Sequence, residues 1–142
     1  VIVNHTWKRG SQTGKRDSDD DNSVYYATDS DNISLDLEFS DNELTELDLS
    51  SVPNLTKLMC QQNQLTELDL SSVPNLTGLW CYDNQLTELD LSSVPDLERL
   101  HCSDNQLTEL DIRPLLTQTP EVEVDSEVKV VKRPDQRPVE RL

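Results

Sequence analysis

The stretch Glu43–Asn105 reads ELTELDLSSVPNLTKLMCQQN, QLTELDLSSVPNLTGLWCYDN and QLTELDLSSVPDLERLHCSDN, which are three consecutive copies of one 21-residue phrase. Fourteen of the 21 positions are identical in all three copies. Self-similarity at a fixed period of this length is typical of a solenoid. One coil cannot bury its own leucines, so each coil stacks on the next and the strands align in a parallel sheet. We therefore predict a solenoid with a parallel β-sheet on one face and short turns and extended segments on the other.

The pattern extends beyond the three copies to about four and a half coils. A degenerate copy comes first, in Leu37, Phe39, Asn42 and Leu44, and a partial copy ends at Ile112. Constant apolar positions are expected to face the core: Leu44, Leu47, Leu49, Val52, Leu55, Leu58, Cys60 and their counterparts 21 and 42 residues later. Asn63, Asn84 and Asn105 follow each strand, where a buried amide can satisfy the backbone groups of the bend.

The positions that differ between copies alternate with the buried leucine and cysteine positions. A strand turns such alternate residues to its other face, so most of them should share one solvent-exposed surface. Exposed Trp, Tyr and Met beside Arg and Lys have the composition of a protein-contact patch. Neutral variation at unconstrained surface positions is the alternative, because scattered surface aromatics are common. The predicted binding face consists of Lys57, Met59, Gln61, Trp80, Tyr82, Arg99, His101 and Ser103.

Composition excludes several classes of function. A net charge of −16 argues against nucleic-acid binding, and no apolar run is long enough to insert in a membrane. No facing set of acid, base and nucleophile can be assembled, so we predict that the chain is not an enzyme. The absence of methionine at Val1 fits either removal of a signal peptide or a fragment that starts there.

An acidic loop precedes the coils. In DSDDDN, the carboxylates of Asp17, Asp19 and Asp21 occupy the first, third and fifth positions of a calcium loop, whereas Thr28 stands where a bidentate glutamate is usual. We keep these three aspartates as a candidate Ca²⁺ site beside the alternative of a solvated acidic loop, and we predict no other cofactor.

Three further columns of residues repeat every 21 residues, two acidic and one of cysteines. Glu46 and Asp48 each begin a column of like charges, whose mutual repulsion leads us to expect that cations stabilise the fold. Cys60, Cys81 and Cys102 occupy a leucine position, which favours buried and reduced thiols over metal ligands or disulfides.

The ends of the chain depart from the repeat. At the N-terminal end we expect a strand within 1–10, a polar loop at 11–16, and strands at 23–28 and 33–39 that cap the core. Alternation of valine with charge in EVEVDSEVKVVK predicts a C-terminal hairpin at 121–132, and the basic, proline-containing KRPDQRPVERL predicts a tail. The expected organisation is an N-terminal cap with the acidic loop (1–36), the repeats (37–112), a C-terminal cap (113–131) and the tail (132–142).

The run C-x-x-N-Q-L-T-E-L-D-L-S at Cys81–Ser92 resembles the leucine-rich repeats of secreted or surface-attached bacterial proteins related to the internalin-like class. The resemblance implies a leucine-rich repeat fold and an extracellular or cell-surface module for adhesion, host-protein binding or scaffolding. Its acidic loop lacks the family's glycine and glutamate, and no cell-wall sorting signal follows the tail. We predict a protein- or glycan-binding module. The alternative is a structural subunit of a surface layer or filament, stabilised by calcium and self-associating through the basic tail.

Overall fold

The computed structural model describes residues 8–9, 13–16, 25–28 and 35–141, with side chains for residues 36–139. These residues form strands and turns but no helix. In chain order the strands are β1 (Lys8–Arg9), β2 (Thr13–Arg16), β3 (Tyr25–Thr28), β4 (Leu35–Glu38), β5 (Leu55–Met59), β6 (Gly78–Trp80), β7 (Arg99–His101), β8 (Glu109–Asp111), β9 (Glu121–Val124), β10 (Lys129–Val131) and β11 (Glu140–Arg141).

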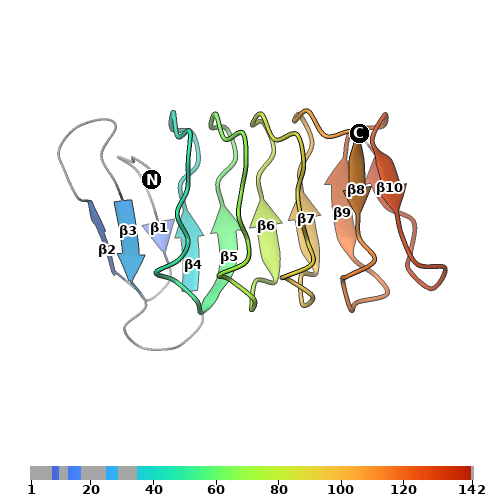
Figure 1. Ribbon diagram of the computed structural model, residues 1–142, viewed down its shortest axis with the longest axis horizontal. Coiled ribbons are helices and arrows are strands. Elements are labelled where there is room, and N and C mark those ends of the chain that lie inside the picture. Colours follow the sequence, from blue (N-terminus) through green and yellow to red (C-terminus); the bar gives the residue numbers. More distant parts are fainter. Residues whose placement is uncertain (1–7, 10–12, 17–24, 29–34, 142) are drawn as a thin grey trace.

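One sheet runs the length of the solenoid in the order β1-β4-β5-β6-β7-β9-β11. Figure 1 shows its strands from β1 to β9 side by side along the horizontal axis. All its neighbours pair in parallel except β1, which is antiparallel to β4 at the N-terminal edge. Leu58, Leu79 and Leu100 stand in register on adjacent strands. The 21-residue period therefore sets the register, and the predicted parallel-strand solenoid is confirmed.

The leucine, valine and cysteine positions of the repeat form one continuous core. Leu58, Leu79 and Cys81 are 0% exposed, and Leu47 packs against the core while only partly buried. Leu37, Phe39 and Leu44 of the degenerate copy are also buried, so this copy is a full member of the stack. The core therefore begins at β4, as the sequence predicts.

Buried asparagines tie each coil to the one before it. The Asn84 Nδ2 atom donates to the carbonyl oxygens of Cys81 (3.1 Å) and Cys60 (3.0 Å), and its Oδ1 accepts the Leu65 N–H at 3.0 Å. Asn63 and Asn105 repeat the pattern. The preceding residue is left-handed in every coil, with φ from 55° to 60° at Asp41, Gln62, Asp83 and Asp104. The amides thus satisfy the carbonyls that these bends turn inward.

Cys60, Cys81 and Cys102 form the expected buried column of free thiols. Burial raises the pKa of the Cys60 and Cys102 thiols to about 12, and it raises the pKa of Cys81 well above its usual range. A thiolate is the reactive form of cysteine, so these side chains behave as small apolar groups in the folded state.

The predicted C-terminal hairpin is wrong. β9 joins the main sheet in parallel to β7, whereas β10 pairs in parallel with β8 in a separate two-stranded sheet. The valines explain the difference, because Val122 and Val124 are buried as extensions of the core and Val128 is buried after the bend. Residues 121–131 therefore make another coil of the solenoid.

The expected tail also folds onto the stack. Gln136 is 2% exposed, and its Nε2 atom donates to the carbonyl oxygens of Ile112 (2.9 Å) and Leu115 (3.1 Å). β11 then pairs in parallel with β9. A glutamine here satisfies open carbonyls as asparagine does in the repeats, which composition alone did not indicate.

At the N-terminal end, the strands expected within 1–10, 23–28 and 33–39 correspond to β1, β3 and β4. The loop expected at 11–16 is partly wrong, because β2 pairs antiparallel with β3.

The asparagine ladder gives a testable stability difference. Asn84→Ala leaves the Leu65 N–H without a partner in the core and removes one of the two donors from each of the Cys60 and Cys81 carbonyls. We therefore expect it to lower the free energy of unfolding by about 1–3 kcal/mol. Urea denaturation followed by circular dichroism measures the change. The control is Asn75→Ala in the same coil, whose side chain is exposed and whose effect should stay below about 0.5 kcal/mol. Equal losses in the two variants would contradict the structural role of the ladder.

The thiol column gives a pH dependence. A pKa that is higher in the folded than in the unfolded state contributes stability below the unfolded value, near 9.0, and that stability is lost as pH rises toward about 12. We therefore expect the urea midpoint to fall above pH ~9, with a shallower fall in Cys60→Ala. At pH ~8 iodoacetamide should alkylate the cysteines only after unfolding, as judged by mass spectrometry. Rapid alkylation of the folded chain would show that the column is accessible.

Candidate functional site

The outer face of the main sheet carries two rows of side chains that run across the strands. Lys57, Gly78, Arg99 and Glu121 are successive partners in one row. Met59, Trp80, His101 and Glu123 form the other. Adjacent parallel strands lie about 4.8 Å apart, so neighbouring side chains of a row touch. The rows bring together residues that lie about one coil apart in the sequence.

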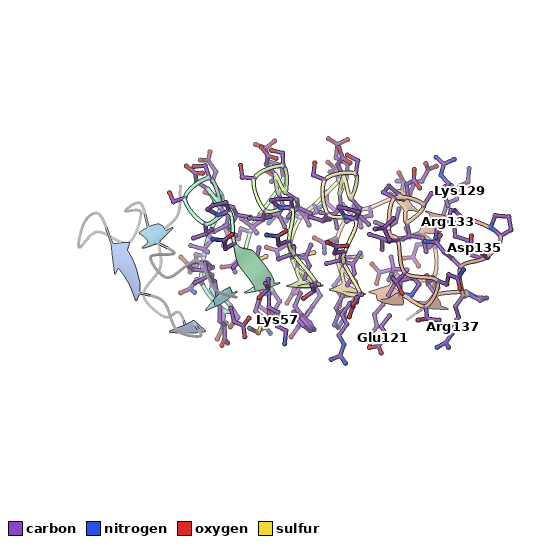
Figure 2. The ribbon with its side chains drawn as sticks, turned by 90° about the horizontal axis from the view of Figure 1, so that it is seen from below. Lys57, Glu121, Lys129, Arg133, Asp135 and Arg137 are labelled. Carbon is purple, nitrogen blue, oxygen red and sulfur yellow. The ribbon has the colours of Figure 1, made fainter. Side chains whose placement is uncertain are left out.

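Seven of the eight predicted face residues reach this surface. Lys57 and Arg99 are exposed, whereas Met59, Gln61, Trp80, Tyr82 and His101 are partly buried. The Gln61 Oε1 atom is shielded from solvent and has no hydrogen-bond partner in the described part of the chain. We call these seven residues the sheet-face patch. Figure 2 shows Lys57 and Glu121 projecting from the same side of the solenoid, away from Lys129.

Trp80 lies along its own strand because Gly78 has no side chain. A Cβ atom placed on Gly78 would stand 2.7 Å from Trp80 Cζ3 and 2.8 Å from Cη2. Other copies carry Lys57 and Arg99 at the glycine position. The indole therefore fills the space that a long basic side chain takes on the neighbouring strands, and one of its faces rests on the sheet.

His101 is held on three sides. The Tyr82 ring stacks on its imidazole, with centroids 4.2 Å apart and an interplanar angle of 25°. The His101 Nδ1 atom lies 3.1 Å from Glu123 Oε2, and its Nε2 atom lies 2.7 Å from Ser103 Oγ. These contacts fix both the plane and the position of the ring.

Ser103 is the predicted face residue that the structure corrects. It is 1% exposed, and its Oγ lies against the His101 ring, 2.7 Å from Nε2. Gln61 and Tyr82 hold the same repeat position and are only partly buried, whereas the short side chain of Ser103 is covered. Ser103 therefore positions His101 and does not meet a partner directly.

Ser103, His101 and Glu123 have the connectivity of a nucleophilic triad, but this arrangement does not form an active site. The Ser103 hydroxyl is inaccessible to a substrate. The Asp104 N–H, which would be the nearest oxyanion donor, is bonded to the Asp125 carboxylate at 2.9 Å. An acyl-transfer reaction needs an exposed nucleophile and free donors, and both are missing here.

The face predicted from the sequence lacks the residues that close the C-terminal side of the site. Glu121 and Glu123 come from β9, and Arg137 precedes β11. The signal was available, because Glu121 follows Arg99 by about one repeat and the same valine alternation continues. With Trp80, Arg99 and His101 they line a hollow of about 360 Å³. Arg99 Nε lies 3.4 Å from Glu121 Oε2.

The aspartates of the acidic column that begins at Asp48 are turn-forming residues. Asp69 Oδ1 accepts the Ser71 N–H at 2.9 Å, and the pair Asp90–Ser92 repeats this contact. Hydrogen bonds from the serine hydroxyl and N–H lower the pKa of Asp69, and they outweigh the opposing repulsion from Asp48. Local hydrogen bonding thus exceeds the like-charge repulsion that the sequence suggested.

The described residues contain no group of three or more metal-ligating side chains. Asp17, Asp19 and Asp21 lie outside the described residues, so calcium binding by the acidic loop stays a prediction. Within the described part there is also no helix with the length and apolar character needed to cross a bilayer.

Basic residues near the C-terminus are engaged within the chain. The Arg133 guanidinium donates to Leu115 O at 2.7 Å and pairs with Asp135, while Lys129 Nζ lies 3.7 Å from Glu109. Arg113 pairs with Asp111 at 2.8 Å. These contacts lie within one chain, and self-association through the basic tail stays a prediction.

Comparisons with known proteins agree with this architecture. The family model for leucine-rich repeats (2 copies) matches residues 74–115. A search of curated proteins finds no match.

Solved structures resemble most of this chain. One is the functional domain of InlJ from Listeria monocytogenes, described as including a cysteine ladder, with a TM-score of 0.56 and 32% identity over 78% of this chain. The leucine-rich repeat domain of APL1B gives a TM-score of 0.56 and 23% identity over 70% of this chain, a likeness of fold. This chain spans 26% and 33% of the lengths of those two chains. It is a leucine-rich repeat protein whose coils resemble those of the internalin-like class.

Proposed function

We propose that this protein is a non-enzymatic, extracellular binding module that contacts a protein or glycan partner through the sheet-face patch. The observation that carries the proposal is the pairing of Gly78 with Trp80. An indole is placed over a glycine on the outside of a sheet whose core is already filled. Neutral surface variation does not account for a glycine and a tryptophan that occur together in one copy of the repeat and hold an aromatic ring in a fixed orientation at the surface.

The distribution of variation supports the same surface. The three copies are identical at their core leucines and at the structural asparagines, while their chemistry diverges at Lys57, Gly78 and Arg99 and in the row that contains Trp80. Leucine-rich repeat domains generally bind proteins, and rigid strands hold contact residues in fixed positions. The extracellular location rests on the likeness to the Listeria domain.

A paired substitution tests the proposal. A partner captured from the protein's native surroundings is identified by mass spectrometry, and its affinity is measured by calorimetry with purified components. Trp80→Ala/Tyr82→Ala should weaken binding at least about thirtyfold, because truncated aromatic residues at a contact centre cost the most. Circular dichroism should show an unchanged fold, since both side chains lie outside the core.

The matched control changes the opposite side of the solenoid. Glu67 and Glu88 hold the repeat position of Glu109, which lies beside Lys129 and away from Lys57 (Figure 2). Glu67→Gln/Glu88→Gln should leave the affinity within about threefold. A partner that tolerates the aromatic double variant but is lost with the glutamate variant would place the binding surface on the acidic side and refute the proposal.

A further inference from the structure

The hollow at the C-terminal end of the sheet-face patch combines an aromatic face with convergent polar groups. Trp80 contributes from β6, Arg99 and His101 from β7, Glu121 and Glu123 from β9, and Arg137 from the segment before β11. In Figure 2, Glu121 and Arg137 project from the same side as Lys57. Its volume of about 360 Å³ is that of a small-ligand site.

Trp80 is arranged as a platform. A tryptophan that anchors a protein interface fills a pocket of its partner, which requires the ring to stand away from its own surface. Here the six-membered ring lies over Gly78, and the stem of Lys57 passes alongside, with its Cγ 3.5 Å from where a Gly78 Cβ would be. The indole is recessed among its neighbours and offers one face to whatever enters the hollow.

The face of an aromatic ring carries partial negative charge and attracts the weakly positive edges of other groups. The C–H groups on one side of a sugar ring are such edges, and they are also apolar. A flat pyranose can therefore lie on Trp80 with its hydroxyl groups directed outward around the ring.

The surrounding polar groups suit those hydroxyls. Two guanidinium groups and two carboxylates line the hollow, so the charges of these four groups balance. Arg99 pairs with Glu121 and His101 with Glu123, which leaves further donor and acceptor positions on each group. Arg137 has no ion-pair partner among the described residues, although its backbone N–H donates to Gln118 O at 2.8 Å. A charged side chain from a partner would meet a like charge on one side of the hollow, whereas a neutral polyhydroxyl ligand meets both donors and acceptors.

We propose that this hollow binds a single neutral hexopyranose ring of a glycan, stacked on Trp80 and hydrogen-bonded by Arg99, Glu121, Glu123 and Arg137. This inference rests on the proposed function, because it assigns the ligand class of the same sheet face. His101 is held in place by Tyr82 and Ser103 and closes one side of the site.

The test uses the full chain with Trp7→Phe, which leaves Trp80 as the remaining tryptophan of the two. Methyl β-D-galactopyranoside and methyl β-D-glucopyranoside are the probes, and galacturonate is the charged arm. At least one neutral glycoside should change the Trp80 fluorescence saturably, with a millimolar dissociation constant as expected for so small a ligand. Saturation-transfer NMR on the unsubstituted chain gives an independent readout on the C–H protons that face the indole.

Gly78→Ala is the decisive variant because it keeps Trp80 but places a Cβ within 2.8 Å of its ring. It should weaken glycoside binding about tenfold, as should Trp80→Ala. The strand should accept alanine, since lysine and arginine occupy the equivalent positions of its neighbours. Arg137→Gln should also weaken binding. Lys129→Gln removes one positive charge on the opposite side of the solenoid, so it is the control and should leave the affinity within about twofold.

Three outcomes would overturn the inference. These are no saturable response to either neutral glycoside, binding of galacturonate alone, and glycoside binding that Gly78→Ala leaves unchanged. If the glycosides fail while a captured partner still requires Trp80 and Tyr82, the hollow receives a protein side chain, so the sugar assignment falls and the proposed function stands. If the captured partner is also indifferent to Trp80 and Tyr82, both fall.

Discussion

Each coil of this chain is open on two sides, and its leucines are buried only by the coils above and below it. That dependence fixes the rest of the structure. Stacking requires every coil to bring the same apolar residues to the same height, which explains why Leu58, Leu79 and Leu100 stand in register. It also requires the bends to close without unsatisfied carbonyls, which the Asn63, Asn84 and Asn105 amides accomplish between coils. Neither requirement involves the side chains on the outer face of the sheet, so those side chains are free to vary.

The repeat predicted the fold and most of the patch because period and alternation translate directly into geometry. Leu58 and Cys60 point inward and Lys57 and Met59 outward for the same reason, the two-residue period of a strand. Prediction failed where the size of a side chain and its neighbours decide its exposure. Ser103 shares its repeat position with Gln61 and Tyr82, but its short side chain is covered beside His101. The orientation of Trp80 could not be predicted from the sequence either, because it depends on contact with Gly78 across the strand surface.

At the C-terminal end, the local sequence pattern fits two structures, a hairpin and a further coil of the solenoid. The valine alternation around Asp125 and Ser126 is also typical of a hairpin, and composition does not distinguish a hairpin from a further coil. Without a further coil, the coil that ends at β8 would leave apolar surface and carbonyl groups open to solvent, and this favours the further coil over a hairpin. Val122 and Val124 cover that surface, and Gln136 takes the carbonyls of Ile112 and Leu115. This extra coil also places Glu121 and Glu123 beside Arg99 and His101, so the site depends on a segment that lacks the repeat motif.

Equal spacing of the strands has a consequence for how the molecule can change length. A whole phrase added between β5 and β6 would meet matching leucines on both sides, and would lengthen the sheet by about 4.8 Å. Everything from Gly78 to Arg137 would move together as a rigid unit, since its internal register is untouched. Of the sheet-face patch, Lys57, Met59 and Gln61 would be carried away from it. Duplication and deletion of single phrases can thus alter the reach of the surface without rebuilding the hollow at its end.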